Sequence, residues 1–423
     1  MKLTPEYRFP EFKNDGDWDG DSLINIAKFR RGSFPQPYGL PEWYDDENGM
    51  PFIQVYDVDD NFRLKQTTKR KISELAAAQS VFIEKGTVII TIQGSIGRVA
   101  ITQYDAYIDR TLLIFQEFYN NIDKTFFAYI LFLLFEIEKL KAPGGIIKTI
   151  TKEVLSDFVV SFPKVQEQQK IASCLSSLDE LIAAHNDKLD ALKDHKKGLL
   201  QNLFPQEGET VPKVRFPDFA NNGKWDNKPI SKLGETVNGL SGKKGADFGS
   251  GRPYVQYKQV FDKSFIDFTE CGKVDVGENE NQNQLQLGDI LFTTSSETPD
   301  EVGFASVINK QPEEPTYLNS FCFILRPNDL NEINPGFSRY LFHSPIYRKS
   351  VSAIAQGSTR YNLSKKAFLK LRVPVPSTPE EQQKIASCLS AVDELITAQQ
   401  EKIEQLQQHK KGLMQGLFPK IES

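Results

Sequence analysis

The chain contains one long helical segment twice. Residues 167–205 (EQQKIASCLSSLDELIAAHNDKLDALKDHKKGLLQNLFP) match residues 381–419 (EQQKIASCLSAVDELITAQQEKIEQLQQHKKGLMQGLFP) at 26 of 39 positions, with a constant offset of 214 residues. In both copies apolar side chains recur at alternating steps of three and four residues, which is the heptad pattern of a coiled coil. A helix with one narrow apolar stripe needs a partner. The repeat therefore predicts two long helices that pair with each other, packed antiparallel with a globular domain between them.

The predicted pairing positions are apolar in both copies. They are Ile171, Leu175, Leu178, Ile182, Leu189 and Leu192 in the first copy and Ile385, Leu389, Val392, Ile396, Ile403 and Leu406 in the second. Polar residues also stand in the heptad pattern, His185 and Lys196 in the first helix and Gln399 and Lys410 in the second. Such residues more often set register than perform chemistry. A helix of ~38 residues would span ~57 Å.

Weaker matches extend the repeat over the whole chain. Arg8-Phe9-Pro10 returns as Arg215-Phe216-Pro217, and Gln54 and Gln256 occupy the same repeat position in segments that read as strands. The segments expected to be strands are 52–58, 87–92, 254–260, 290–294 and 320–325, and 126–140 and 337–342 are expected to be helical. We therefore predict an α+β fold in which two β-rich globular domains alternate with two long coiled-coil helices, a pseudo-twofold tandem repeat. The predicted segments are 1–160 (first domain), 161–212 (first helix and linker), 213–375 (second domain) and 376–423 (second helix).

The two copies differ in how far they have diverged. The helices are nearly identical, whereas the domains share only scattered positions. We favour the interpretation that the helices do one job twice while the domains have diverged, over homogenisation of the helices by recombination. A duplicated structural protein would have diverged to a similar degree throughout.

The charge is distributed unevenly. The formal net charge of −5 argues against binding to nucleic acid. However, residues 333–379 contain no acidic side chain and eight basic ones: Arg339, Arg348, Lys349, Arg360, Lys365, Lys366, Lys370 and Arg372. The second domain therefore has local positive charge that the total conceals.

Motifs of catalysis, metal binding and membrane insertion are missing. The sequence has no Gly-x4-Gly-Lys-Ser/Thr loop, no Asn/Asp-Pro-Pro-Tyr/Phe quartet and no zinc spacing among its four cysteines and four histidines. The apolar run 126–135 is too short to cross a bilayer. The N-terminus has no apolar signal-peptide core, so we expect a cytoplasmic protein with reduced thiols, bound to no membrane.

The duplicated EQQKIASCLSSLDELI…HKKGLLQNLFP motif, the repeated Arg-Phe-Pro, the Gly-Asp-Ile-Leu strand at 288–291 and the Gln-Gly-Ser-Thr-Arg-Tyr-Asn-Leu-Ser stretch at 356–364 resemble the specificity subunit of type I restriction-modification enzymes. The resemblance covers essentially the whole chain. It implies that two target recognition domains each read half of a split site in double-stranded DNA. It also implies that the helices set the gap between the halves and dock two methyltransferase subunits, and that motor-nuclease subunits join this core. The resemblance places S-adenosylmethionine in the methyltransferase partner, so this chain is expected to bind no cofactor and to be no enzyme itself.

DNA binding requires cations and amides for phosphates, and Arg or Gln for base edges. The candidate residues are Arg30, Arg31, Gln54, Arg63, Lys65, Ser95, Arg98 and Lys148 in the first domain and Lys243, Lys244, Arg252, Gln256, Lys258, Arg360, Tyr361, Lys365 and Lys366 in the second. We rank Arg360 and Tyr361 first, because they stand in the acid-free window on a Gly/Ser/Thr-rich loop. A basic run is more often a solvated face, and the paired glutamines could be scaffold.

Two other functions remain open at this stage. A scaffold that joins two identical partners without reading DNA would suit the net charge and the twin helices. A single-chain restriction enzyme is opposed by the missing catalytic motifs.

Overall fold

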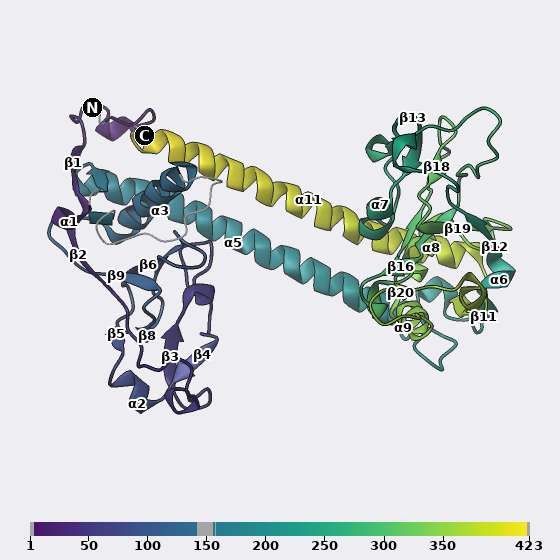
Figure 1. Ribbon diagram of the computed structural model, residues 1–423, viewed down its shortest axis with the longest axis horizontal. Coiled ribbons are helices and arrows are strands. Elements are labelled where there is room, and N and C mark those ends of the chain that lie inside the picture. Colours follow the sequence, from purple (N-terminus) through teal and green to yellow (C-terminus); the bar gives the residue numbers. More distant parts are fainter. Residues whose placement is uncertain (1–3, 142–154, 157, 421–423) are drawn as a thin grey trace. The chain divides into compact units, whose positions relative to one another are not determined.

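The computed structural model describes residues 4–141, 155–156 and 158–420, which form two compact units. The first unit comprises residues 1–187 and 400–423, and the second comprises residues 188–399. The long helices α5 (Val165–Asn202) and α11 (Pro379–Leu417) are each shared between the units, so that each unit contains one part of both helices (Figure 1). The bounds of the four segments predicted from the sequence, two domains and two helices, remain a prediction.

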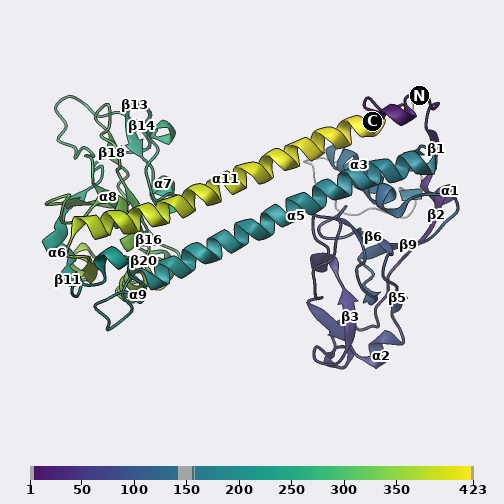
Figure 2. The same cartoon turned by 180° about the vertical axis from the view of Figure 1, so that it is seen from behind.

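The first unit is built on two four-stranded sheets. Their strand orders are β2-β9-β6-β7 and β4-β3-β8-β5, and β1 pairs with β10 in a separate two-stranded sheet. The strands are β1 (Asp19–Ser22), β2 (Ala27–Arg31), β3 (Met50–Ile53), β4 (Arg70–Ile72), β5 (Val81–Ile83), β6 (Val88–Thr91), β7 (Val99–Ile101), β8 (Ala106–Ile108), β9 (Leu112–Phe118) and β10 (Val159–Phe162), and the shorter helices are α1 (Leu23–Ile26), α2 (Glu74–Ala77) and α3 (Lys124–Lys141). Helix α3 lies beside α5 in both views (Figures 1 and 2).

The second unit repeats this plan. Its sheets are β12-β19-β15-β17, β14-β13-β18, β11-β21 and β16-β20. The strands are β11 (Asp226–Pro229), β12 (Gly234–Asn238), β13 (Phe248–Val255), β14 (Gly272–Val274), β15 (Ile290–Thr293), β16 (Ser295–Ser296), β17 (Ala305–Val307), β18 (Tyr317–Leu318), β19 (Cys322–Pro327), β20 (Tyr361–Asn362) and β21 (Arg372–Val375), and the helices are α6 (Ile230–Leu233), α7 (Tyr257–Asp262), α8 (Pro335–Leu341), α9 (Pro345–Ala353) and α10 (Lys365–Phe368). In both units one pair of neighbouring strands is parallel, β3 with β8 and β13 with β18. The predicted α+β tandem repeat is confirmed.

Two of the predicted strands are too long. The segments 52–58 and 254–260 leave the strand conformation after Ile53 and Val255, and the chain then turns into a 3-10 helix at Val55–Asp57 and into α7, respectively. Gln54 and Gln256 are therefore the residues that precede these helices and not strand residues, as the sequence had suggested. In the first unit the Asp57 carboxylate accepts a hydrogen bond from the Gln54 backbone N–H at 2.8 Å, which satisfies a donor that a continuing strand would have paired in the sheet.

The repeated sequence motifs make the same buried contact in each unit. Arg8 donates two hydrogen bonds to the Glu167 carboxylate, at 2.8 and 2.7 Å, and Arg215 does the same to Glu381, at 2.7 Å each. Both carboxylates are 1% exposed. The Arg-Phe-Pro motif and the start of the Glu-Gln-Gln-Lys motif are thus two halves of one anchor, which fixes the first turn of each long helix to its unit.

The next helix residue, Gln168 or Gln382, ties the helix to the loop before α3 or α8. In the first unit Gln168 Oε1 accepts from the Asp123 N–H at 2.9 Å, and in the second Gln382 Oε1 accepts from the Asn334 N–H at 2.9 Å. Both glutamines are buried. At the start of the repeated segment, the identity of the two copies is therefore explained by contacts that hold each helix to its unit.

The two long helices contact each other within each unit through a lysine and an aspartate. In the second unit Lys196 of α5 pairs with Asp393 of α11 at 2.6 Å, and in the first unit Lys410 of α11 pairs with Asp179 of α5. In the first unit Ile171 and Leu417 belong to one hydrophobic core, so a residue near the start of α5 lies beside the last residue of α11. The helices are therefore antiparallel there, and the matching contacts of the second unit give the same direction.

Most of the predicted pairing positions are buried. Leu178, Leu192 and Ile396 are half-buried, and the other nine are buried. The lysines at the polar positions, Lys196 and Lys410, form ion pairs, as expected for residues that set register.

The first unit completes its main core with the end of α11. Phe418 is 4% exposed, its ring stacks on Phe126 of α3 at a centroid distance of 5.3 Å, and it meets the edge of Trp18 at 6.1 Å. Phe204, at the end of α5, makes the corresponding contacts with Phe337 and Trp225 in the second unit. Each unit therefore depends on the last turn of the helix that began in the other.

We predict that Phe418→Ala destabilises the first unit by about 3–5 kcal/mol, because a buried ring is replaced by a cavity. Hydrogen exchange followed by mass spectrometry should show faster exchange in α3 and β1, with the second unit unchanged. Phe204→Ala should produce the converse pattern. Leu395→Ala, at a side chain that is 56% exposed, serves as the control. Equal acceleration in both units after Phe418→Ala would contradict this assignment.

Candidate nucleic-acid interface

The parallel strand pair of each unit brings two polar residues to one edge. The carboxyl ends of parallel neighbours lie at the same edge of a sheet, and here Gln54 follows β3 while Asp109 follows β8. In the second unit Gln256 follows β13 and Asn319 follows β18. The backbone junction is the same in both: the Asp109 N–H donates to the Ile53 carbonyl at 3.0 Å, and the Asn319 N–H donates to the Val255 carbonyl at 2.9 Å.

In the first unit this edge carries a chain of four hydrogen-bonded side chains. Tyr56 donates to Gln54 Oε1, Gln54 Nε2 donates to the Tyr38 hydroxyl at 2.5 Å, and Tyr38 donates to Asp109 Oδ2 at 3.4 Å. Burial, followed by the negative charge of Asp109, raises the pKa of Tyr38, so this phenol stays protonated and remains a donor. The predicted residue Gln54 is therefore buried, and its side chain forms two hydrogen bonds, one to each tyrosine.

Two cations flank the tyrosines of this chain. The Arg110 guanidinium carbon lies 5.7 Å from the centre of the Tyr38 ring, and Lys69 Nζ lies 4.8 Å from the centre of the Tyr56 ring. Tyr38 and Tyr56 are 42% and 37% exposed. Exposed rings beside cations are well suited to nucleic acid, which offers flat bases and negative phosphates. Sequence reasoning missed Tyr38, Tyr56, Asp109 and Arg110, because Tyr56 stands inside the expected strand 52–58 and the other three lie outside every element expected from the sequence.

The corresponding edge of the second unit has a different set of side chains. Arg360 lies 6.0 Å from the centre of the Phe321 ring, which is 57% exposed. Tyr257 donates to the Ser295 carbonyl at 2.6 Å, and the Thr294 N–H donates to the Phe321 carbonyl at 2.9 Å. The loops before β16, β19 and β20 therefore meet beside α7, which brings the predicted residues Arg360 and Tyr361 near the start of this helix, whereas Lys258 is exposed on the helix itself.

Arg360 is held on a tight hairpin. Gln356 and Asn362 exchange backbone hydrogen bonds at 3.0 and 2.8 Å, which closes the loop between them. Gly357 has a φ of 143°, and a Cβ there would clash with the Arg360 carbonyl oxygen. The glycine is thus required for the turn that presents Arg360.

The other predicted residues of the first unit lie in several places. Arg30 and Arg31 are exposed on β2, and Lys65 is exposed in the loop before β4. Arg63 pairs with Glu180 of α5 at 3.7 Å, whereas Ser95 and Arg98 lie in the loop between β6 and β7. Lys148 lies outside the described residues.

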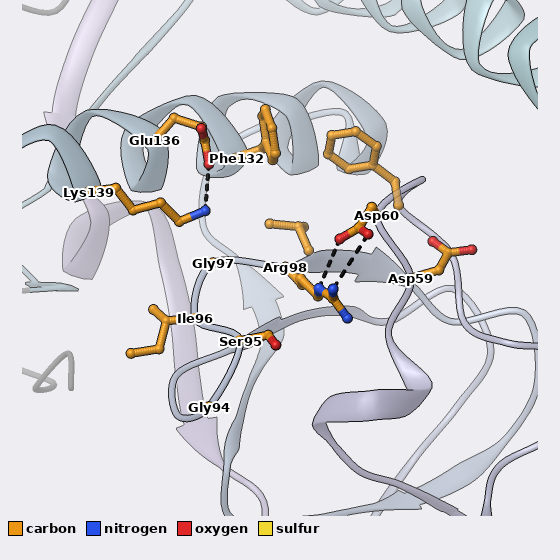
Figure 3. A pocket seen from close by; sticks show the side chains of 12 residues that line it. Asp59, Asp60, Gly94, Ser95, Ile96, Gly97, Arg98, Phe132, Glu136 and Lys139 are labelled. Atoms are coloured by element: carbon orange, nitrogen blue, oxygen red, sulfur yellow. Dashed lines mark hydrogen bonds and ion pairs between the residues drawn. The ribbon is translucent and has the colours of Figure 1, made fainter. Parts of the chain in front are cut away.

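Ser95 and Arg98 line a cavity of about 540 Å3 between the β6–β7 loop and α3 (Figure 3). Arg98 pairs with Asp60 at 2.8 Å, and Lys139 pairs with Glu136 at 2.6 Å. Both cations of the lining are therefore neutralised by neighbouring carboxylates, and Arg98 is not a free phosphate ligand in this structure.

In the second unit several predicted cations are also engaged. Lys243 pairs with Glu280 at 2.6 Å, and this hydrogen bond is the main reason that the pKa of Glu280 falls to about 2. Arg252 pairs with Glu314 at 3.2 Å, and Lys365 donates to Asn238 Oδ1. Lys244 and Lys366 are exposed.

The acid-free window does not form one basic surface. Arg339 pairs with Asp393 at 2.8 Å, Arg348 donates to backbone carbonyls of residues 300–303, and Arg372 donates to the Asn227 carbonyl. These three arginines hold the unit together. The positive charge of the window is therefore only partly available to a ligand, and among its predicted residues Arg360 and Lys366 are exposed.

The described part of the chain also bears on metal binding and membrane insertion. It contains no group of three or more His, Cys, Asp or Glu side chains that could hold a metal ion. Among its helices, none is both long and apolar enough to cross a membrane.

The sequence matches the family described as type I restriction modification DNA specificity domain over residues 37–194 and 222–408. The type I restriction enzyme MjaVIII specificity subunit of Methanocaldococcus jannaschii is 24% identical, over 99% of this chain and 96% of that one. The EcoKI specificity subunit of Escherichia coli is 24% identical, over 40% of this chain and 37% of that one.

Two solved structures share the fold. The S subunit of a type I restriction-modification system from M. genitalium aligns with a TM-score of 0.56 at 17% identity, covering 99% of this chain and all of the other. A chain from a study of type I system assembly and conformational transition aligns with a TM-score of 0.58 at 16% identity, covering 95% and 97%.

We predict that Arg360→Ala and Lys366→Ala each weaken the binding of duplex DNA without impairing folding. Each lost phosphate contact should reduce the slope of log affinity against log salt by about one. Fluorescence anisotropy over a salt series measures this slope. Lys349→Ala is the control, because Lys349 stands in the same acid-free window but pairs with Glu207. Unchanged affinity and slope in both variants would show that this surface only faces solvent.

Proposed function

The chain belongs to the family of type I restriction-modification specificity subunits, and from this premise we propose that each of its globular domains reads one half of a bipartite DNA site. Members of this family are non-catalytic subunits of type I complexes, whose catalytic activities reside in other subunits. Double-stranded DNA and methyltransferase subunits are the partners that the family implies, with S-adenosylmethionine carried by the methyltransferase and motor-nuclease subunits joining the same core.

One observation carries the proposal for two half-sites. The same backbone junction recurs at the edge of the parallel strand pair in both units, while the side chains on it differ: Asp109 and Arg110 in the first unit, Asn319 and Ser320 in the second. A shared scaffold with different side chains is what two domains need in order to dock on DNA alike and read different bases.

We further propose that the helices dock two copies of the methyltransferase. Pairing of the helices and anchoring to the domains account for the identity of buried positions. They do not account for side chains that are exposed and still identical in both copies, namely Gln169/Gln383, Ser173/Ser387, Glu180/Glu394, Leu181/Leu395, Lys188/Lys402, His195/His409, Lys197/Lys411 and Gln201/Gln415. Two identical exposed surfaces on one chain suit two identical partners.

The helices also suit the role of a spacer between the half-sites. A helix of 38 residues is ~57 Å long, which exceeds the ~34 Å of one turn of DNA. The ion pairs of Lys196 with Asp393 and of Lys410 with Asp179 oppose slippage of one helix along the other. A scaffold that reads no DNA is the alternative, and the exposed Arg360 and Arg110 beside exposed aromatic rings favour DNA over it.

The proposal predicts the result of a domain exchange. Replacing residues 213–375 with the second domain of a relative should change one half-site and leave the other half and the spacer length unaltered, because the helices are retained. Methylome sequencing of a host that carries the gene with its methyltransferase partner measures both motifs. A change in both half-sites, or a new spacer length, would refute independent reading, and the absence of any split motif would favour the scaffold.

The stoichiometry provides a second prediction. Native mass spectrometry of the co-expressed complex should show two methyltransferase subunits for each copy of this chain. A stable one-to-one species at saturating methyltransferase would contradict docking on both helices.

A further inference from the structure

We propose that Arg110 reads the edge of a guanine base in the half-site recognised by the first unit. The inference rests on the proposed function, since it names one chemical group that the first domain would recognise. Sequence reasoning had placed the first-domain contacts at other residues, and the structure assigns this position instead.

The side chain of Arg110 is exposed and presented by a defined backbone. It comes two residues after the end of β8, and the preceding residue, Asp109, is fixed by its hydrogen bond to the Ile53 carbonyl. The guanidinium lies over the exposed Tyr38 ring. Within the described residues, no carboxylate forms an ion pair with Arg110, in contrast to Arg63 and Arg98. The donors of Arg110 are thus available to a ligand.

The charge around Arg110 favours a base edge over a phosphate. Asp109 is 3% exposed, and its Oδ2 accepts from Thr111 at 3.2 Å and from Tyr38 at 3.4 Å. No donor among the described residues reaches the other oxygen, Oδ1. The negative charge of the buried Asp109 carboxylate is therefore only partly balanced by hydrogen bonds, and it repels a phosphate placed next to it. A neutral base edge experiences no such repulsion.

The repeat supports the same assignment. At the position of Arg110 the second unit has Ser320, and its exposed guanidinium comes instead from Arg360, which lies over Phe321. Both units therefore present one arginine over one exposed ring near the same edge, from different places in the chain. Residues that read different sequences are expected to differ in this manner, whereas a scaffold residue would recur at its repeat position.

Guanine is the base that matches an arginine. Its O6 and N7 are two acceptors in the major groove that fit the planar fork of a guanidinium, and a good bidentate contact of this kind discriminates by about tenfold to a hundredfold. A lysine supplies the charge without the fork. A substitution of arginine by lysine can therefore distinguish a contact to a base edge from attraction between a cation and the DNA backbone.

The test uses the complete complex with its methyltransferase subunits. Methylome sequencing of the wild type and of the domain exchange first identifies the half-site of the first unit, which must contain a G·C pair. 7-Deazaguanine, which lacks N7, then replaces one guanine of the duplex at a time. The wild-type complex should lose about tenfold to a hundredfold in affinity at one guanine of the first half-site.

Three variants decide the role of Arg110. Arg110→Ala should bind the natural duplex at least as weakly as the wild type binds the modified one, because it loses the contacts to both O6 and N7, and it should be insensitive to 7-deazaguanine at that position. Arg110→Lys should keep the salt dependence of the wild type and still lose this sensitivity. Lys85→Ala, which removes an exposed cation at the far end of β6, is the matched control and should retain the full sensitivity.

Several outcomes would overturn the inference. They are a first half-site without guanine, a wild type that is insensitive at every guanine of that half-site, and an Arg110→Ala complex that keeps the sensitivity. An Arg110→Ala complex that only binds all duplexes more weakly, with a reduced salt slope, would assign Arg110 to a phosphate. If the wild type methylates no split motif, the proposed function itself fails and the inference fails with it.

Discussion

One carboxylate in each unit joins three elements. Asp179 of α5 accepts a hydrogen bond from Tyr129 of α3 at 2.6 Å and pairs with Lys410 of α11. Asp393 of α11 does the same with Tyr340 of α8, at 2.7 Å, and with Lys196 of α5. In the first unit, loss of Lys410 would leave the largely buried charge of Asp179 uncompensated, which is more costly than the pair itself is stabilising, whereas in the second unit Arg339 also pairs with Asp393. A slip of the helices along their apolar seam would have this effect, so the ion pairs restrict the helices to one register and hold each globular domain to both of them.

In this arrangement the residues that hold each unit together are distinct from the side chains that we propose contact DNA. The Arg8–Glu167 and Arg215–Glu381 pairs, the buried glutamines that follow them and the backbone junction after the parallel strands are the same in both units. Side chains at the edge of the parallel pair contribute little to these anchors and are therefore free to differ. The two units can thus have one fold and two recognition chemistries.

The distribution of charge shows why counting cations along the sequence is insufficient. The partners of Arg63, Lys243 and Arg252 are Glu180, Glu280 and Glu314, which are 37 to 117 residues away in the chain. A basic loop is a basic surface only if the fold brings no acid to it. By this criterion Arg360, Lys366, Arg30 and Arg31 remain candidates for contact with DNA, whereas Arg98 and Lys243 are neutralised.

The sequence alone determined the tandem repeat, the two long helices and their antiparallel partnership, because heptad spacing and near-identity are local properties that depend on no distant contact. Nine of the twelve apolar positions that it assigned to the pairing of the helices are buried, and its resemblance indicated the family. The end of β3 was beyond it, since a capping hydrogen bond from the Gln54 N–H to Asp57 competes with continuation of the strand, and so was the end of β13, where α7 begins. Only the tertiary structure decided which polar residues share an edge. Asp109 and Gln54 stand 55 positions apart, and they meet because parallel strands place their carboxyl ends side by side, which no single-segment pattern encodes.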